Sequence, residues 1–84
     1  MPPYRIEWLD EAQADVSRLH RPTALRLFDG ILHHAHSGGG HISPLHGNMA
    51  DSFRLRLDKY RNLFMLRDDV MRIFGVRHRS EAFR

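Results

Sequence analysis

The chain has 84 residues, a mass of 9.9 kDa and no cysteine, and its 13 Lys and Arg residues outnumber its 10 Asp and Glu residues. This length predicts one domain over residues 1–84, with one small core. The lack of cysteine excludes a disulfide framework and a thiol nucleophile. A net charge of +3 suits a partner that carries phosphates or acidic side chains.

The charge is distributed unevenly along the chain. Residues 52–84 contain nine basic and four acidic residues, a net charge of +5, whereas residues 1–51 contain four basic and six acidic residues, a net charge of −2. The N-terminal segment lacks the apolar run of a signal peptide, and no stretch approaches the roughly 20 apolar residues that span a bilayer. We therefore expect a soluble, cytoplasmic protein with no membrane partner and a cationic C-terminal third.

The first third of the sequence predicts one strand and two helices. Tyr4 to Trp8 alternates apolar and charged residues, as a half-buried strand does. Asp10 is expected to cap a first helix over about residues 11–19. Pro22 suits the first turn of a second helix, in which apolar residues recur at three- and four-residue spacing as far as Ala35. Two short helices in tandem predict an antiparallel helical hairpin.

The remainder of the chain predicts a loop and three strands. Three consecutive glycines, residues 38–40, end the second helix and open a loop to about Asp51. Strands follow at about residues 52–58, 61–67 and 70–76, with a tight turn at Asp68 and Asp69, and such short connections require antiparallel pairing. The sequence therefore predicts an α+β fold in the order β-α-α-β-β-β, with a small single-layer antiparallel sheet packed on the N-terminal helical hairpin.

Arginines alternate with apolar residues in the first of these three strands, Ser52-Phe53-Arg54-Leu55-Arg56-Leu57. The two-residue period of a strand puts Arg54 and Arg56 on one face and the apolar side chains on the other. A plain solvated face would show the same pattern. Arg61 and Arg77, near the ends of the neighbouring strands, favour a phosphate site, because a guanidinium can hold a phosphate through two hydrogen bonds.

The ordering F-R-L-R-L-x-x-Y-R, then a hairpin, then a strand that ends in G-V-R-H-R-S-E-A-F-R resembles the RelE/ParE superfamily of bacterial type II toxins. The likeness extends over nearly all 84 residues. It implies a RelE-like fold and a ribosome-dependent mRNA endonuclease that inhibits translation, uses the RNA's own 2′-hydroxyl as nucleophile and needs no metal or other cofactor. It also implies a cognate antitoxin as protein partner, the ribosome and mRNA as targets, and DNA contact only through the antitoxin.

The resemblance also assigns roles by position. The expected catalytic residues are those that match the basic positions of the family, together with a neighbouring histidine: Arg54, Arg56, Arg61, Arg77 and His78. Lys59, Arg79 and Phe83 are the expected substrate-binding residues.

Phe83 stands where several RelE proteins have a tyrosine. Its ring keeps the stacking surface but has no hydroxyl for proton transfer. His78 is the local replacement, since imidazole titrates near neutral pH, although strand alternation could turn it away from Arg77.

Two alternatives to the ribonuclease remain. A ParE-like, non-enzymatic toxin that inhibits DNA gyrase would share the fold, but it would lack the basic constellation that the four arginines keep. A catalytically weak module that binds RNA or antitoxin is the other alternative, because Phe83 replaces the tyrosine.

The sequence contains four histidines close together, at His33, His34, His36 and His41. Only His33 and His36 have the spacing of one helix face, and no nearby carboxylate or cysteine completes a ligand set. We expect no functional metal site. Histidines at a helix end complement the helix dipole instead.

Overall fold

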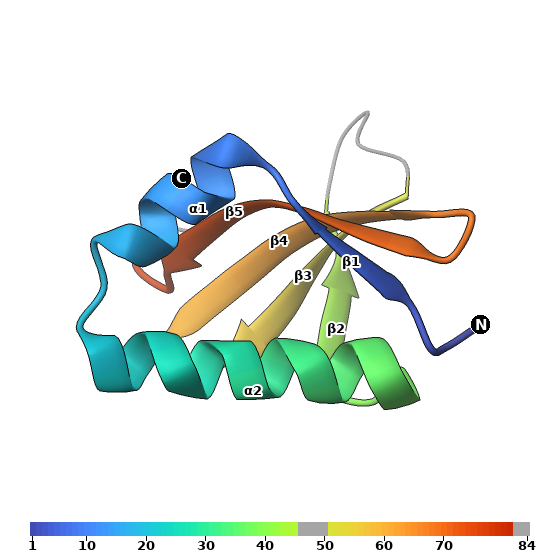
Figure 1. Ribbon diagram of the computed structural model, residues 1–84, viewed down its shortest axis with the longest axis horizontal. Helices are drawn as coiled ribbons and strands as arrows, with labels where there is room; N and C mark the ends of the chain where they lie inside the picture. The colour runs from blue at the N-terminus through green and yellow to red at the C-terminus, as the bar shows by residue number, and fades with distance from the viewer. Residues whose placement is uncertain (46–50, 82–84) are drawn as a thin grey trace.

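The computed structural model describes residues 1–45 and 51–81, which form two helices and five strands (Figure 1). In chain order the elements are β1 (Arg5–Trp8), α1 (Asp10–Ser17), α2 (Arg21–Ser37), β2 (His41–Pro44), β3 (Ser52–Leu57), β4 (Tyr60–Arg67) and β5 (Val70–His78). The strands make one sheet in the order β1-β5-β4-β3-β2. The predicted α+β class, with two helices before the main strands, is confirmed.

The sheet is mixed, whereas an antiparallel sheet was expected. Strands β2, β3, β4 and β5 pair antiparallel, as their short connections require. Strand β1 instead runs parallel to β5, with Arg5 opposite Val70 and Trp8 opposite Ile73. No turn joins these two strands directly, because both helices and three strands lie between them in the chain, so local sequence does not set their relative direction.

Two details of the predicted elements are wrong. The expected loop before Asp51 contains strand β2, in which Ile42 pairs with Leu55 of β3; the part of this loop at residues 46–50 lies outside the described ranges. Helix α1 begins at Asp10 itself, after an N-cap residue Leu9 that offers no side-chain hydrogen bond. Asp10 therefore lies in the first helical turn, where its negative charge complements the dipole.

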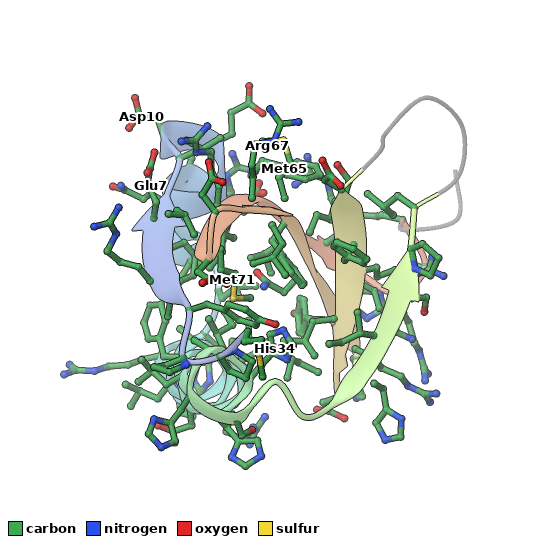
Figure 2. All side chains as sticks on the ribbon, turned by 90° about the vertical axis from the view of Figure 1, so that its right-hand side faces the viewer. Glu7, Asp10, His34, Met65, Arg67 and Met71 are labelled. Atoms are coloured by element: carbon green, nitrogen blue, oxygen red, sulfur yellow. The ribbon has the colours of Figure 1, made fainter. Side chains whose placement is uncertain are left out.

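The core lies between the helices and one face of the sheet. Helix α2 runs along this face, and α1 packs near the C-terminal end of β5 (Figure 1). Seen along α2, the strands curve around the helix, with Met71 on the inner side (Figure 2). The buried cluster draws on α1, α2, β3, β4 and β5 and consists of Ala12, Ile31, Ala35, Leu55, Phe64, Met71 and Ile73. No described helix is long and apolar enough to cross a membrane.

A β-bulge interrupts the pairing of β4 with β5. Leu63 pairs with Gly75, but the next residue, Phe64, pairs with Ile73, so Phe74 is an extra residue on β5. Ile73 is fully buried on the helix side. The extra residue reverses the alternation beyond it, so that Gly75 and Arg77 lie on the opposite, open face of the sheet.

Candidate functional site

Three arginines lie side by side across adjacent strands of the open face. Arg56 of β3 pairs with Arg61 of β4, and Arg61 pairs with Arg77 of β5. Directly paired residues share a face of the sheet. Their neighbours Leu55 and Val76 are buried toward the helices, which places the three arginines on the other face. We call Arg56, Arg61 and Arg77 the arginine row.

Arg61, the central member of the row, is buried, with 7% of its surface exposed. Its Nη1 donates hydrogen bonds to the backbone carbonyls of Asp58, at 3.0 Å, and Tyr60, at 2.9 Å. Burial of the guanidinium, followed by the positive charges of Arg56, Arg54 and Arg79, lowers the pKa of Arg61 below its ordinary 12.5. The side chain remains a cation at neutral pH. Its charge is thus fixed in place and unfavourable in the absence of an anion.

Carboxylates pair with the arginines at the other end of the open face. Nη2 of Arg67 lies 3.3 Å from Oδ2 of Asp51, and Nε of Arg72 lies 3.3 Å from Oε1 of Glu7. Within residues 1–45 and 51–81, no carboxylate pairs with Arg56 or Arg61. The structure therefore separates arginines that are neutralised within the fold from arginines that are available to an external anion.

Arg77 occupies the edge of the row. Its guanidinium lies over Gly75, where a Cβ atom would come within 3.2 Å of Nη1. The same nitrogen donates to Oδ2 of Asp15 on α1. The Arg77 guanidinium thus lies at the edge of the open face, and a carboxylate of α1, Asp15, fixes it there.

His78 lies on the helix side of the sheet, opposite Tyr60 of β4. The two rings are perpendicular, with centroids 5.4 Å apart. Nδ1 of His78 lies 2.9 Å from the hydroxyl oxygen of Ser80 and 3.2 Å from its backbone nitrogen. His78 is therefore outside the arginine row, but it lines one hollow of about 600 Å³ together with Arg77.

The other predicted site residues surround the turn between β3 and β4. Arg54 is half-buried on β3, and its charge and that of the exposed Arg79 both act on Arg61. Lys59 is exposed in the turn, and its carbonyl accepts a 2.7 Å hydrogen bond from the backbone N–H of Arg79. Phe83 lies outside the described residues.

The histidine cluster divides between the core and the surface. His34 is buried between Tyr4 and Phe64, with ring centroids 5.8 and 5.5 Å away, and its Nδ1 lies 2.8 Å from the carbonyl oxygen of Gly39 (Figure 2). His33 and His36 are exposed. Among the described residues, no three His, Cys, Asp or Glu side chains gather in a way that could hold a metal ion.

The sequence analysis missed Asp15 and the bulge at Phe74. The contact between Asp15 and Arg77 joins residues 62 positions apart, and nothing in the helical pattern of α1 distinguishes this aspartate from a solvated one. The stretch from Val70 to Gly75 contains no turn signal that would mark an extra residue. The sequence does contain one indication, a glycine inside a strand, which often accompanies a bulge or a close approach.

No protein-family model and no curated protein sequence matches the chain. Solved structures do match. A chain of the toxin–antitoxin complex RelBE2 from Mycobacterium tuberculosis has a TM-score of 0.80 at 21% identity, over 92% of this chain and 99% of that chain. A chain of the RelE–RelB complex from Pyrococcus horikoshii has a TM-score of 0.77 at 18% identity, over 95% of this chain and 99% of that chain. A chain of the DinJ–YafQ complex from E. coli has a TM-score of 0.68 at 13% identity, over 99% of this chain and 100% of that chain.

These similarities establish the fold. At such identities the common feature is the arrangement of helices and strands, and that arrangement is the one found in structures of RelE, YoeB and YafQ toxins with their antitoxins. The chain has a RelE-like fold.

Proposed function

We propose that this RelE-like chain is the toxin of a type II toxin–antitoxin system and cleaves mRNA on the ribosome. The arginine row carries the proposal, because it sets three guanidinium groups on adjacent strands, and two of them have no carboxylate partner in the described ranges. Negative charge grows on a phosphodiester as it is attacked, and fixed cations stabilise that charge.

The proposed chemistry takes its nucleophile from the substrate. The 2′-hydroxyl of one nucleotide loses its proton to solvent water and attacks the adjacent phosphorus, and the bond from phosphorus to the 5′-oxygen of the next nucleotide breaks, so that this oxygen leaves with a proton. The arginine row, with Arg54 beside it, holds and neutralises the phosphate. The protonated imidazole of His78 supplies that proton and becomes neutral imidazole. Positioning and charge stabilisation account for most of the rate in such a site, and neither requires a metal.

The residues around the turn between β3 and β4 are proposed to bind flanking RNA. Lys59 and Arg79 are exposed beside the arginine row, where they can contact neighbouring phosphates. Phe83 is proposed to stack on a base, since an aromatic ring offers every base a π-face.

The partners follow from the same surface. A cognate antitoxin with an acidic, partly disordered segment would neutralise the arginine row and block access to RNA. Contact with DNA would come through the antitoxin. Because ribosomes and mRNA are the proposed targets, the proposed place of action is the cytoplasm.

The decisive experiment maps mRNA ends on translating ribosomes after addition of the purified protein. We expect cuts within the codon in the ribosomal A site, while the same RNA without ribosomes stays nearly intact. The matched control is the Arg61→Ala variant, which should leave the ribosome-bound RNA uncut. Intact mRNA, together with gyrase-trapped DNA breaks, would support a gyrase inhibitor instead. Intact mRNA without DNA breaks would leave a binding module.

A further inference from the structure

Asp15 lies at the junction of α1, β5 and the hollow beside the arginine row. The hollow has a volume of about 600 Å³, and both Asp15 and Arg77 line it. The side chain of Asp15 is 15% exposed. It is therefore close to the proposed reaction site while being mostly shielded from water.

One oxygen of Asp15 accepts two hydrogen bonds from β5. Oδ2 accepts from the backbone N–H of Val76 at 2.9 Å and from Nη1 of Arg77. The parallel strand β1 pairs with β5 only as far as Ile73, so the backbone N–H of Val76 has no strand partner on that side. The carboxylate therefore closes the exposed edge of β5 and orients an arginine of the row with the same atom.

Arg77 needs such a constraint more than Arg61 does. Arg61 is buried and tied to two carbonyls of its own turn. The Arg77 side chain is 36% exposed and lies over Gly75, which has no side chain to hold it. A long side chain in this position samples many rotamers unless a partner restricts it. Asp15 is the described carboxylate that restricts it.

We propose that Asp15 is a positioning residue that holds the guanidinium of Arg77 in the orientation required by the scissile phosphate. This inference rests on the proposed RNA cleavage and adds a residue to its machinery. Asp15 acts through Arg77 and need not touch RNA. A purely structural role, in which Asp15 only ties α1 to β5, makes a different prediction, because it would act on folding independently of Arg77.

The test is a double-mutant cycle for Asp15→Asn and Arg77→Ala, measured as cleavage of mRNA on programmed ribosomes. Asparagine keeps an acceptor for the Val76 N–H and removes the charge that orients Arg77. We expect Asp15→Asn to lower kcat by up to about 100-fold, as small displacements of catalytic groups do. The KM should not rise, since the variant removes a negative charge near the RNA. In the Arg77→Ala background, the same substitution should have no further effect on kcat.

Two further variants sharpen the result. Asp29→Asn on α2 removes one exposed carboxylate of the same kind and should leave kcat unchanged. Gly75→Ala puts a Cβ atom 3.2 Å from Nη1 of Arg77 and leaves the carboxylate of Asp15 in place, so it should shift the guanidinium slightly and lower kcat even if Asp15→Asn folds poorly. Asp15→Glu, which restores the charge, should recover part of the loss.

The outcomes separate the two proposals. If the parent protein cuts no ribosome-bound mRNA, the proposed function is overturned and the positioning role with it. If the parent cuts mRNA and Asp15→Asn cuts equally fast, only the positioning role is overturned. Equal losses from Asp15→Asn in the parent and in the Arg77→Ala background would also overturn it, since Asp15 would then act independently of Arg77.

Discussion

Arginines on one face of this sheet differ in what neutralises them. Arg67 and Arg72 have carboxylate partners at 3.3 Å. Among the described residues, the hydrogen-bond partners of the Arg61 guanidinium are backbone carbonyls, and burial, followed by the positive charges around it, lowers its pKa. The fold thus supports an unfavourable concentration of positive charge in one place. Strain of this kind is typical of sites that bind an anion.

The arginine row should therefore matter more to RNA cleavage than Arg67 and Arg72 at the other end of the open face. We expect Arg61→Ala and Arg77→Ala each to lower the single-turnover cleavage rate by about a hundred- to thousandfold, which corresponds to about 2.7 to 4 kcal/mol of transition-state stabilisation. Rates on programmed ribosomes, with urea unfolding of each variant in parallel, provide the measurement.

The matched controls are Arg67→Ala and Arg72→Ala, which remove the same charge from the other end of the open face. We expect rates within a few-fold of the parent for both. If these controls lost as much activity as the row variants, total charge rather than the location of the row would determine the rate.

His78 offers a second test at this scale. Its ring lines the same hollow as Arg77, and we propose that its protonated form gives a proton to the leaving oxygen. We expect His78→Ala to lower single-turnover cleavage by about 100-fold, the lower end of general acid–base catalysis. His36→Ala, which alters an exposed histidine on α2, is the control and should have no effect. An unchanged rate in His78→Ala would assign proton transfer to another group.

Among the secondary-structure elements, predictability followed the range of the interactions that define them. Strands β3, β4 and β5 and both helices were predictable, because hydrophobic periodicity and turn residues are local signals. The turn at Asp68 and Asp69 is confirmed, with φ values of +55° and +61°. Strand β2 has only four residues, one of them Pro44 at its end. Its extended conformation depends on pairing with β3, and no local signal in its own sequence indicates that pairing.

The site was predictable to a similar extent. The period-two pattern placed Arg54 and Arg56 on one face of β3, as the pairing with β4 shows. The contact of Arg77 with Asp15 depends on how α1 packs against β5, and a pairwise contact over 62 residues leaves no periodic trace in one sequence. The roles of these residues in catalysis stay predictions.

Helix α2 contains Gly30, whose presence in a helix interior looks unfavourable by propensity. The structure gives the reason: a Cβ atom at this position would collide with Cδ2 of Leu57 on β3. Alanine should raise helix propensity by about 1 kcal/mol, but crowding costs about 1 to 3 kcal/mol where the contacted side chain is held by its neighbours. We expect Gly30→Ala to lower the free energy of unfolding, measured in urea.

The control for Gly30 is Asp29→Ala, at an exposed position on the same helix. It gains helix propensity without a new contact and should leave stability equal to the parent or slightly higher. A gain of about 1 kcal/mol in Gly30→Ala would mean that Leu57 moves aside freely, and that α2 and β3 are less tightly packed than the structure indicates.

For the whole molecule, the two faces of the sheet have opposite effects on the stability of the fold. The inner face is covered by the helices and carries the apolar core. The open face carries like charges whose repulsion opposes folding. An anion that binds the arginine row should therefore stabilise the native protein, since anything that binds only the folded state raises its stability.

We expect inorganic tripolyphosphate to raise the melting temperature more than sodium chloride of equal ionic strength. At 100 times its dissociation constant, a ligand adds about 2.7 kcal/mol, and each kcal/mol shifts the melting temperature of a domain this small by about 4 to 8 °C. The gain should be smaller in Arg56→Ala than in Arg72→Ala. Equal gains in both variants would show that the anion binds elsewhere.

The extra residue in β5 has a further consequence for how this strand encodes its two surfaces. Up to Ile73 the odd-numbered residues face the core, whereas beyond Phe74 the even-numbered residues do. The alternation of inward and outward side chains therefore changes at Phe74. Deleting Phe74 would make the pairing of β5 with β4 continuous, with Arg77 still on the open face and His78 still on the helix side. Sequences of relatives must therefore be aligned with a gap permitted at this position, or the arginine of one protein will be matched to the core residue of another.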